Sequence, residues 1–128
     1  MKVKECVLIK PLVCQRGATV VEVARILRDN KQRRAVVVDN GKPIGIVSTT
    51  DLSNKVVAGA MDAMLKVEDV MTSPIYLTCD IDDELNEIFK RMVNHESFFC
   101  PVTEHGKLVG ILTYGELISK VKRVMNEG

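Results

Sequence analysis

A twelve-residue stretch that occurs twice constrains the fold more than any other feature of the sequence. Residues 41–52 (GKPIGIVSTTDL) and residues 106–117 (GKLVGILTYGEL) align without a gap, and we call their constant spacing, from Gly41 to Gly106, the repeat offset. Each copy reads as a turn, a buried apolar strand, and a hydroxyl residue followed three positions later by an acid, where a helix begins. A repeat of fixed period indicates two copies of one supersecondary unit.

The segments before each copy predict a long helix in each half. Residues 19–22 (TVVE) have the pattern of a capping box, and apolar residues follow them at helical spacing as far as Leu27. The same apolar face recurs at the repeat offset, at residues 85–92, where Asp82 or Asp83 is the expected N-cap. We therefore expect both helices to cover one side of a sheet.

Strand signals surround these helices. The expected strands are residues 12–14, 35–39, 43–47, 76–78, 99–103 and 108–112. Asn40-Gly41 is a strong hairpin signal because both residues tolerate a positive φ. A short strand follows each of Pro11 and Pro74. We call the spacing between these two prolines the lead-in offset. It is shorter than the repeat offset, so two residues have been gained or lost between the proline and the next element.

Each half therefore reads β-α-β-β-α, with its last helix directly after the motif, and the fold class is α/β (α+β). We expect two repeats, residues 3–62 and 66–125, packed about a pseudo-twofold axis around a shared core, since neither sheet is covered by its own half alone. Residues 59–65 between the repeats are helix-compatible and lack proline, so one rigid unit is expected. The length of 128 residues suits this arrangement.

Composition bears on function mainly by exclusion. Eighteen basic and seventeen acidic residues give a net charge of +1, which offers no general attraction for nucleic acid or an anionic membrane. No apolar run approaches the roughly 20 residues of a membrane span, and the amino-terminal segment does not resemble a signal peptide, so a cytoplasmic location is expected. His95 and His105 are expected in solvated turns, and no catalytic or metal-binding set is apparent. We expect a protein that binds without turnover and requires no cofactor.

The four cysteines, Cys6, Cys14, Cys79 and Cys100, contain no C-x-x-C pair, so a zinc site is not expected. Cys14 and Cys79 are separated by the repeat offset, which puts them at equivalent places in the two halves. One interpretation makes them small apolar filler of the core. The other makes them a redox-sensitive pair.

The double β-α-β-β-α order and the motif Gly-h-h-[Ser/Thr]-x-x-[acid]-h, in which h is apolar, at residues 45–52 and 110–117 resemble a tandem pair of CBS domains, known as a Bateman module. The resemblance covers about residues 3–125. It implies a regulatory module whose clefts bind AMP, ADP, ATP or an adenosyl compound such as S-adenosylmethionine. It also implies a homodimer that signals to a partner protein.

The resemblance implies that each cleft is shared between the two halves. Cleft one is expected to combine the following residues: Ser48, Thr49, Asp51, Thr78, Phe98, Phe99 and Cys100. The hydroxyl and the first helical N–H groups would hold a phosphate. The Asp51 carboxylate would accept hydrogen bonds from both ribose hydroxyls, and an aromatic ring would stack near the adenine. In the simpler interpretation Ser48 and Asp51 only cap a helix and the phenylalanines belong to the core.

Cleft two is expected to combine the following residues: Val13, Arg33, Arg34, Ala35, Thr113 and Glu116. It departs from the family pattern twice, because Val13 stands where threonine is usual and Glu116 replaces the shorter aspartate. A longer acid would reach too far or reorient. Arg33 and Arg34 are candidate phosphate donors, or simply cations that end a helix and remain solvated. Cleft one is therefore the stronger candidate.

Three functions remain open from the sequence. The first is a sensor of adenine nucleotides or of an adenosyl compound. The second is a ligand-independent assembly module, in which both motifs serve only as helix caps. The third is a thiol switch that uses Cys14 and Cys79.

Overall fold

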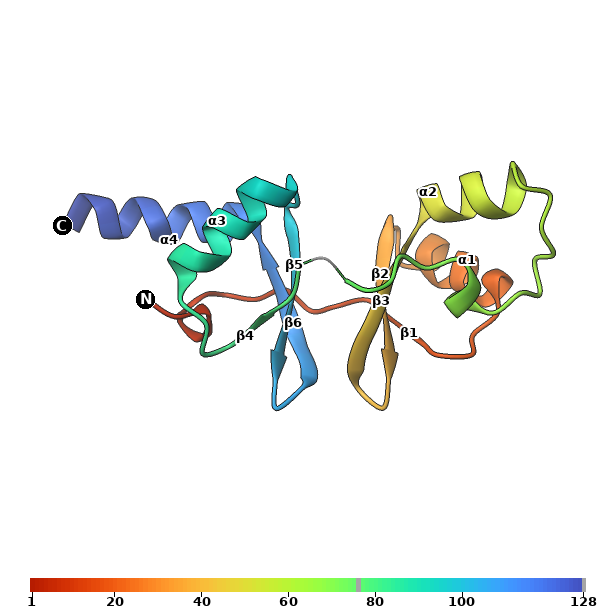
Figure 1. Cartoon of the computed structure of the whole chain (residues 1–128), viewed down its shortest axis with the longest axis horizontal. Helices are drawn as coiled ribbons and strands as arrows, with labels where there is room; N and C mark the ends of the chain where they lie inside the picture. Colours follow the sequence, from red (N-terminus) through yellow and green to blue (C-terminus); the bar gives the residue numbers. More distant parts are fainter. Residues whose placement is uncertain (76, 128) are drawn as a thin grey trace. The chain divides into compact units, whose positions relative to one another are not determined.

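The computed structural model describes residues 1–75 and 77–127 (Figure 1). Contacts divide the chain into two compact units. The first unit is Leu12–Ile75, and the second unit combines Met1–Pro11 with Tyr76–Gly128. The expectation of one rigid unit stays a prediction. The units differ from the two sequence repeats, because the amino-terminal segment packs with the second repeat.

Both units have the predicted β-α-β-β-α order. The first unit contains β1 (Val13–Gln15), α1 (Val20–Asp29), β2 (Arg34–Asp39), β3 (Lys42–Ser48), α2 (Thr49–Asp51), the π-helical segment η2 (Leu52–Val57) and the 3-10 segment η3 (Val67–Asp69). The second unit contains the 3-10 segment η1 (Val3–Glu5), β4 (Cys79–Asp80), α3 (Leu85–His95), β5 (Phe99–Glu104), β6 (Lys107–Thr113) and α4 (Tyr114–Glu127). The prediction of an α/β fold built from two such repeats is confirmed.

The sheets of the two units share one topology. Strand order is β1-β2-β3 in the first unit and β4-β5-β6 in the second, with the first pair parallel and the second pair antiparallel. The register of the hairpin shifts between Val37 and Val38, and again at the equivalent place between Val102 and Thr103. Asn40 and Gly41 have φ of 51° and 82°, which confirms the predicted tight hairpin turn.

Each unit has a hydrophobic core cluster of its own. In the first unit, Val23 and Leu27 of α1 pack with buried β2 and β3 residues such as Val37. In the second unit, Ile88 and Met92 of α3 occupy the corresponding place. The single core shared between the repeats stays a prediction. In each unit the helices lie on one side of the sheet (Figure 1), as predicted.

The two long helices begin differently. At α1, Thr19 accepts a hydrogen bond from the Glu22 N–H, and Glu22 accepts one from the Thr19 N–H, so the predicted capping box is present. At α3 the predicted cap is wrong, because the N-cap position belongs to Glu84 and not to Asp82 or Asp83. Asp83 is engaged in the preceding turn instead, where its Oδ2 accepts from the Asp80 N–H at 2.9 Å.

Two other local predictions also need correction. The strand expected at residues 76–78 lies instead at Cys79–Asp80. Its position follows the repeat offset and not the spacing from the preceding proline, since Cys79 pairs with Val102 just as Cys14 pairs with Val37. Residue 76 itself lies outside the described residues. The helix-compatible link 59–65 is not helical, since the chain turns at Ala60 with φ of 53°. It is nevertheless fixed, because its Leu65 carbonyl accepts from the first N–H of α1 at 2.8 Å.

The segment that precedes the proline of each repeat, residues 7–10 or 70–73, is called the lead-in segment and pairs with the last strand of the other repeat. Ile46 of β3 exchanges backbone hydrogen bonds of 2.8 and 3.1 Å with Thr72. Ile111 of β6 does the same with Ile9, with both distances 3.0 Å. Glycine makes this approach possible, because a Cβ at Gly45 would lie 3.0 Å from the Thr72 carbonyl oxygen. The segments at Thr72 and Ile9 therefore lie beside the two repeated motifs.

Candidate functional site

The first motif forms a tight turn between β3 and α2. The Ser48 hydroxyl oxygen accepts from the Asp51 N–H at 3.1 Å. In return, Asp51 Oδ2 accepts from the Ser48 N–H at 2.9 Å and from the Ser48 hydroxyl at 3.1 Å. These contacts make a complete capping box, which is the structural interpretation of the motif.

The second oxygen of the Asp51 carboxylate holds a lysine. Asp51 Oδ1 lies 3.2 Å from Lys55 Nζ, four residues along the chain. The same ammonium donates to the Val70 carbonyl at 2.8 Å. Only 14% of the Asp51 side chain is exposed, against 44% of the lysine side chain. Lys55 therefore joins the start of the helical segment to the chain that leads to Thr72.

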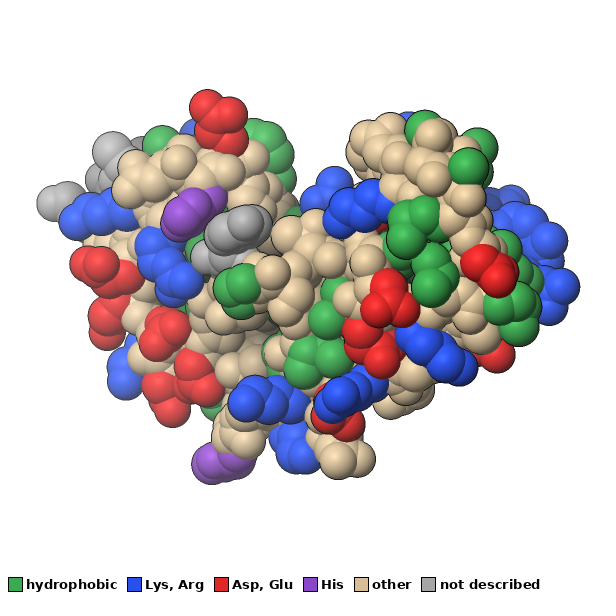
Figure 2. Space-filling model, turned by 45° about the vertical axis from the view of Figure 1, so that its right-hand side comes forward, with side chains coloured by type: hydrophobic (Ala, Val, Ile, Leu, Met, Phe, Trp, Pro, Cys, Tyr) green, Lys and Arg blue, Asp and Glu red, His purple; other side chains and the backbone are tan. Residues whose placement is uncertain are grey.

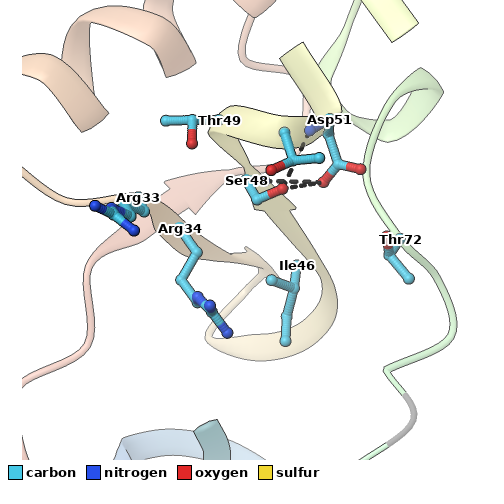
Figure 3. A pocket seen from close by; sticks show the side chains of 8 residues that line it. Arg33, Arg34, Ile46, Ser48, Thr49, Asp51 and Thr72 are labelled. Carbon is cyan, nitrogen blue, oxygen red and sulfur yellow. Dashed lines mark hydrogen bonds between the residues drawn. The ribbon is translucent and has the colours of Figure 1, made fainter. Parts of the chain in front are cut away.

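A pocket of about 380 Å³ opens beside this turn. It is lined by Arg33, Arg34, Ile46, Ser48, Thr49, Thr50, Asp51 and Thr72, all within the first unit. In Figure 3 the two arginines and Thr72 flank the Ser48–Asp51 turn from opposite sides. The pocket thus combines a carboxylate, hydroxyl groups and two guanidinium groups, which together can bind a polar ligand that carries an anionic group.

The grouping of residues in this pocket differs from the grouping made by sequence. Ser48, Thr49 and Asp51 were expected in cleft one, whereas Arg33 and Arg34 were expected in cleft two; here all five line one pocket. The local reason is the hairpin, since Arg34 pairs with Ser48 across β2 and β3 and the Thr49 N–H donates to the Arg33 carbonyl at 2.8 Å.

Sequence reasoning missed three lining residues, Ile46, Thr50 and Thr72. Ile46 and Thr50 lie within the repeated motif and could have been included on that ground. Thr72 had a weaker sequence signal, because it lies outside the repeated motif. It corresponds to Ile9 only at the lead-in offset, which differs from the repeat offset.

The second motif directs its acid elsewhere. The Thr113 hydroxyl accepts from the Glu116 N–H at 3.3 Å, as a helix cap does. Glu116 Oε2, however, accepts from the backbone N–H of Val7 at 3.2 Å. Val7 is the counterpart of Val70 at the lead-in offset, the spacing from Pro11 to Pro74. The longer Glu116 side chain therefore contacts its lead-in segment directly, whereas Asp51 is connected to the corresponding segment through Lys55.

The remaining predicted residues of cleft one all belong to the second unit. Phe98 is 63% exposed, and its ring packs edge-on against Tyr114, with 5.2 Å between ring centres. Thr78 and Phe99 are partly buried, and Cys100 is fully buried in the core. The pairing of these residues with Asp51 stays a prediction.

The remaining predicted residues of cleft two, Val13 and Ala35, lie in β1 and β2 of the first unit. Ala35 is fully buried, and Val13 is partly buried. Their grouping with Thr113 and Glu116 of the second unit likewise stays a prediction.

The cysteines fit the filler interpretation. Cys14 is buried in the core of the first unit, whereas Cys79 is buried in the core of the second unit, where its Sγ lies 3.3 Å from that of Cys100. The hydrogen bond with Cys100, followed by burial, raises the pKa of Cys79, and burial raises the pKa of Cys14. A raised pKa keeps these thiols protonated and poorly nucleophilic.

Acidic and basic side chains occur together over both units on the face drawn in Figure 2, in keeping with the balanced composition. Within residues 1–75 and 77–127, no helix combines the length and apolar character that a membrane span needs. In the same part of the chain, His, Cys, Asp and Glu side chains do not gather in threes as metal ligands would.

Comparison with known proteins identifies relatives along most of the chain. The sequence profile of the CBS domain matches residues 3–58 and 67–123. A protein of Methanopyrus kandleri is 34% identical over 103 residues, which make up 78% of this chain and 52% of that protein. The chain thus spans about half the length of that relative.

Two solved structures share the fold. One is a CBS domain pair/ACT domain protein of Thermotoga maritima, with a TM-score of 0.75 and 21% identity, covering 97% of this chain and 98% of that chain. The other is a CBS domain protein of Pyrobaculum aerophilum complexed with AMP, with a TM-score of 0.76 and 22% identity, covering 96% and 99%. At these identities the likeness establishes the fold.

Proposed function

The chain belongs to the CBS domain family, and on that premise we propose that it is a regulatory module that binds an adenine nucleotide or a related adenosyl compound. Binding is not followed by turnover. The ligand changes how the module contacts a partner protein, through its different affinity for two conformations. As the family resemblance implies, the functional form is a homodimer.

One observation carries this proposal: the pocket beside the first motif holds both a carboxylate and two guanidinium groups. Its volume of about 380 Å³ falls within the range of small-molecule sites. Asp51 would accept from a ribose hydroxyl, and Arg33 and Arg34 would donate to a phosphate. The Pyrobaculum aerophilum protein, which carries AMP on the same fold, supports the ligand class.

The residues of the second unit complete the proposal. We assign the adenine to the part of cleft one expected from Thr78, Phe98, Phe99 and Cys100. The exposed Phe98 ring offers apolar area for a base. The second motif is the weaker site, since the Glu116 carboxylate already accepts from the Val7 N–H.

Calorimetric titration with AMP, ATP and S-adenosylmethionine tests the proposal. A ligand that binds only the folded protein stabilises it by RT ln(1 + [L]/Kd), about 2.7 kcal/mol at a concentration of 100 Kd. We expect Asp51→Ala to remove most of this effect and Glu116→Ala, the matched control, to retain it. The absence of binding by any of the three compounds at millimolar concentration would defeat the proposal.

A second candidate is a ligand-independent assembly module, and the complete capping box at Ser48 favours it. In that case Asp51→Ala would cost about 0.5–2 kcal/mol of stability. The oligomeric state, measured by light scattering, would be the same with and without AMP. Ligand-dependent stabilisation of the wild-type protein separates the two candidates.

A further inference from the structure

The hydrogen-bonding capacity of Asp51 is nearly filled before any ligand arrives. A carboxylate offers about four lone-pair positions, two on each oxygen. Oδ2 accepts from both the N–H and the hydroxyl of Ser48. Oδ1 forms an ion pair with Lys55, whose Nζ lies 3.2 Å away. If the ammonium is counted as one group on Oδ1, one position on that oxygen remains, whereas a ribose with both hydroxyls free has two donors to place.

The two anchors also fix the orientation of the carboxylate. A carboxylate held at one oxygen can turn about the bond that joins it to its Cβ, whereas one held at both oxygens cannot. Lys55 is itself held, because its ammonium donates to the Val70 carbonyl at 2.8 Å. Lys55 does not line the pocket, and it acts on a ligand through Asp51.

We propose that Lys55 is a positioning residue that leaves Asp51 able to accept one ribose hydroxyl only, and that it thereby sets which of the two hydroxyls is recognised. This inference rests on the proposed function. It departs from the expectation that the carboxylate accepts both hydroxyls, one on each oxygen. The site would then tolerate a substituent or a deletion at the other hydroxyl.

The second unit provides a matched control for this lysine. Lys120 follows Glu116 by four positions, just as Lys55 follows Asp51, so the two lysines are equivalent in sequence. There the carboxylate accepts from the Val7 N–H itself. Replacing Lys120 tests whether loss of the equivalent lysine in the other unit also changes which ribose hydroxyl is recognised.

The experiment is a calorimetric titration of the full chain with AMP, 2′-deoxy-AMP and 3′-deoxy-AMP. In the wild-type protein we expect one deoxy analogue to bind about tenfold or more weakly than AMP, because it loses a hydrogen bond to a charged group, while the other binds nearly as well. In Lys55→Met the carboxylate can turn, and the difference between the two analogues should fall to about twofold. Lys55→Arg should restore part of it, and Lys120→Met should leave it unchanged. If Lys55→Met does not fold, Lys55→Gln replaces it under the same criteria.

Three results would overturn the inference. Equal losses for both analogues in the wild-type protein would mean that Asp51 accepts both hydroxyls. An unchanged difference in Lys55→Met, with all three affinities lowered alike, would make Lys55 merely structural. Failure of the wild-type protein to bind AMP would overturn the inference, and it would remove the proposed function as well only if ATP and S-adenosylmethionine also failed to bind; the other two results leave the proposed function standing.

Discussion

The acid of the first motif, Asp51, contacts a lysine side chain, whereas the acid of the second motif, Glu116, contacts the backbone N–H of Val7. Both arrangements join the start of a helix to the lead-in segment of the other repeat, at Val70 in one unit and at Val7 in the other. Glu116 has one methylene group more than Asp51, which gives its carboxylate the longer reach. Both copies of the motif thus keep the connection between the helix start and the lead-in segment, but they differ in how far the carboxylate is free to bind a ligand.

The residues that precede the motifs differ as well. Arg33 and Arg34 occupy positions equivalent, at the repeat offset, to Phe98 and Phe99. The backbone contact is retained, since the Thr49 N–H donates to the Arg33 carbonyl just as the Tyr114 N–H donates to that of Phe98. The first unit therefore presents cations beside its motif, and the second presents aromatic rings. This difference is the physical basis for expecting two unequal sites.

Packing of the lead-in segments should give the largest effects. We expect Gly45→Val and Gly110→Val each to lower the free energy of unfolding by about 1–3 kcal/mol, measured by urea denaturation. A Cβ at Gly110 would lie 2.7 Å from Leu8 Cβ, and one at Gly45 would collide with Met71 and the Thr72 carbonyl.

Ligand affinity distinguishes the two glycine variants. Thr72 lines the pocket, so Gly45→Val should also weaken AMP binding, whereas Gly110→Val should not. Equal effects of the two substitutions on affinity would contradict the assignment of the pocket to the first motif.

The helix caps should give the next largest effects. Ser48→Ala is expected to cost about 1–2 kcal/mol and Thr113→Ala about 0.5 kcal/mol. The serine both donates to and accepts from Asp51 at 3.1 Å, whereas the threonine accepts from the Glu116 N–H at 3.3 Å. Chemical denaturation of both variants is the measurement, and a larger loss in Thr113→Ala would reverse the comparison.

Removal of the Glu116 carboxylate should cost about 0.5–1.5 kcal/mol, because the Val7 N–H loses its partner. The substitution should also change Cys6. Burial raises the pKa of Cys6, and the Glu116 charge raises it further. Glu116→Ala should therefore lower that pKa and speed alkylation of Cys6 by iodoacetamide at pH 8, followed by mass spectrometry. Asp51→Ala is the control, and an unchanged alkylation rate in Glu116→Ala would argue against the contact.

Alkaline pH should give the smallest effect. The pKa values of Cys14 and Cys79 are raised from 9.0, so the unfolded chain loses these protons first and stability falls as pH rises through that value. At pH 9 the loss is about 0.4 kcal/mol for each thiol. Unfolding of the wild-type protein and of a Cys14→Ala/Cys79→Ala variant should be compared at pH 7 and pH 9. An equal pH dependence in both would show that the thiols do not contribute.

The sequence predicted the order of elements, the hairpin at Asn40-Gly41 and the capping box at Thr19, because local rules govern each of these features. The α3 cap was missed because two carboxylates, Asp80 and Asp83, satisfy a preceding turn. The exchange of lead-in segments was missed because no local pattern states which sheet a short apolar segment will join.

The candidate site was predicted in part for the same reason. The motif identified Ser48, Thr49 and Asp51, all of which line the pocket. Lys55 was not singled out, although it recurs as Lys120, because its contact with Val70 depends on how a distant segment folds back. Sequence alone also did not indicate that the Glu116 carboxylate reaches Val7.

The most direct test of the inequality between the two motifs is a titration with AMP followed by amide chemical shifts in an isotopically labelled protein. We expect the amides of Ser48 and Asp51 to shift in a saturable manner while those of Thr113 and Glu116 stay nearly constant. Saturable shifts at Thr113 and Glu116 with none at Ser48 and Asp51 would contradict the account, as would the absence of any shift with AMP, ATP or S-adenosylmethionine at millimolar concentration.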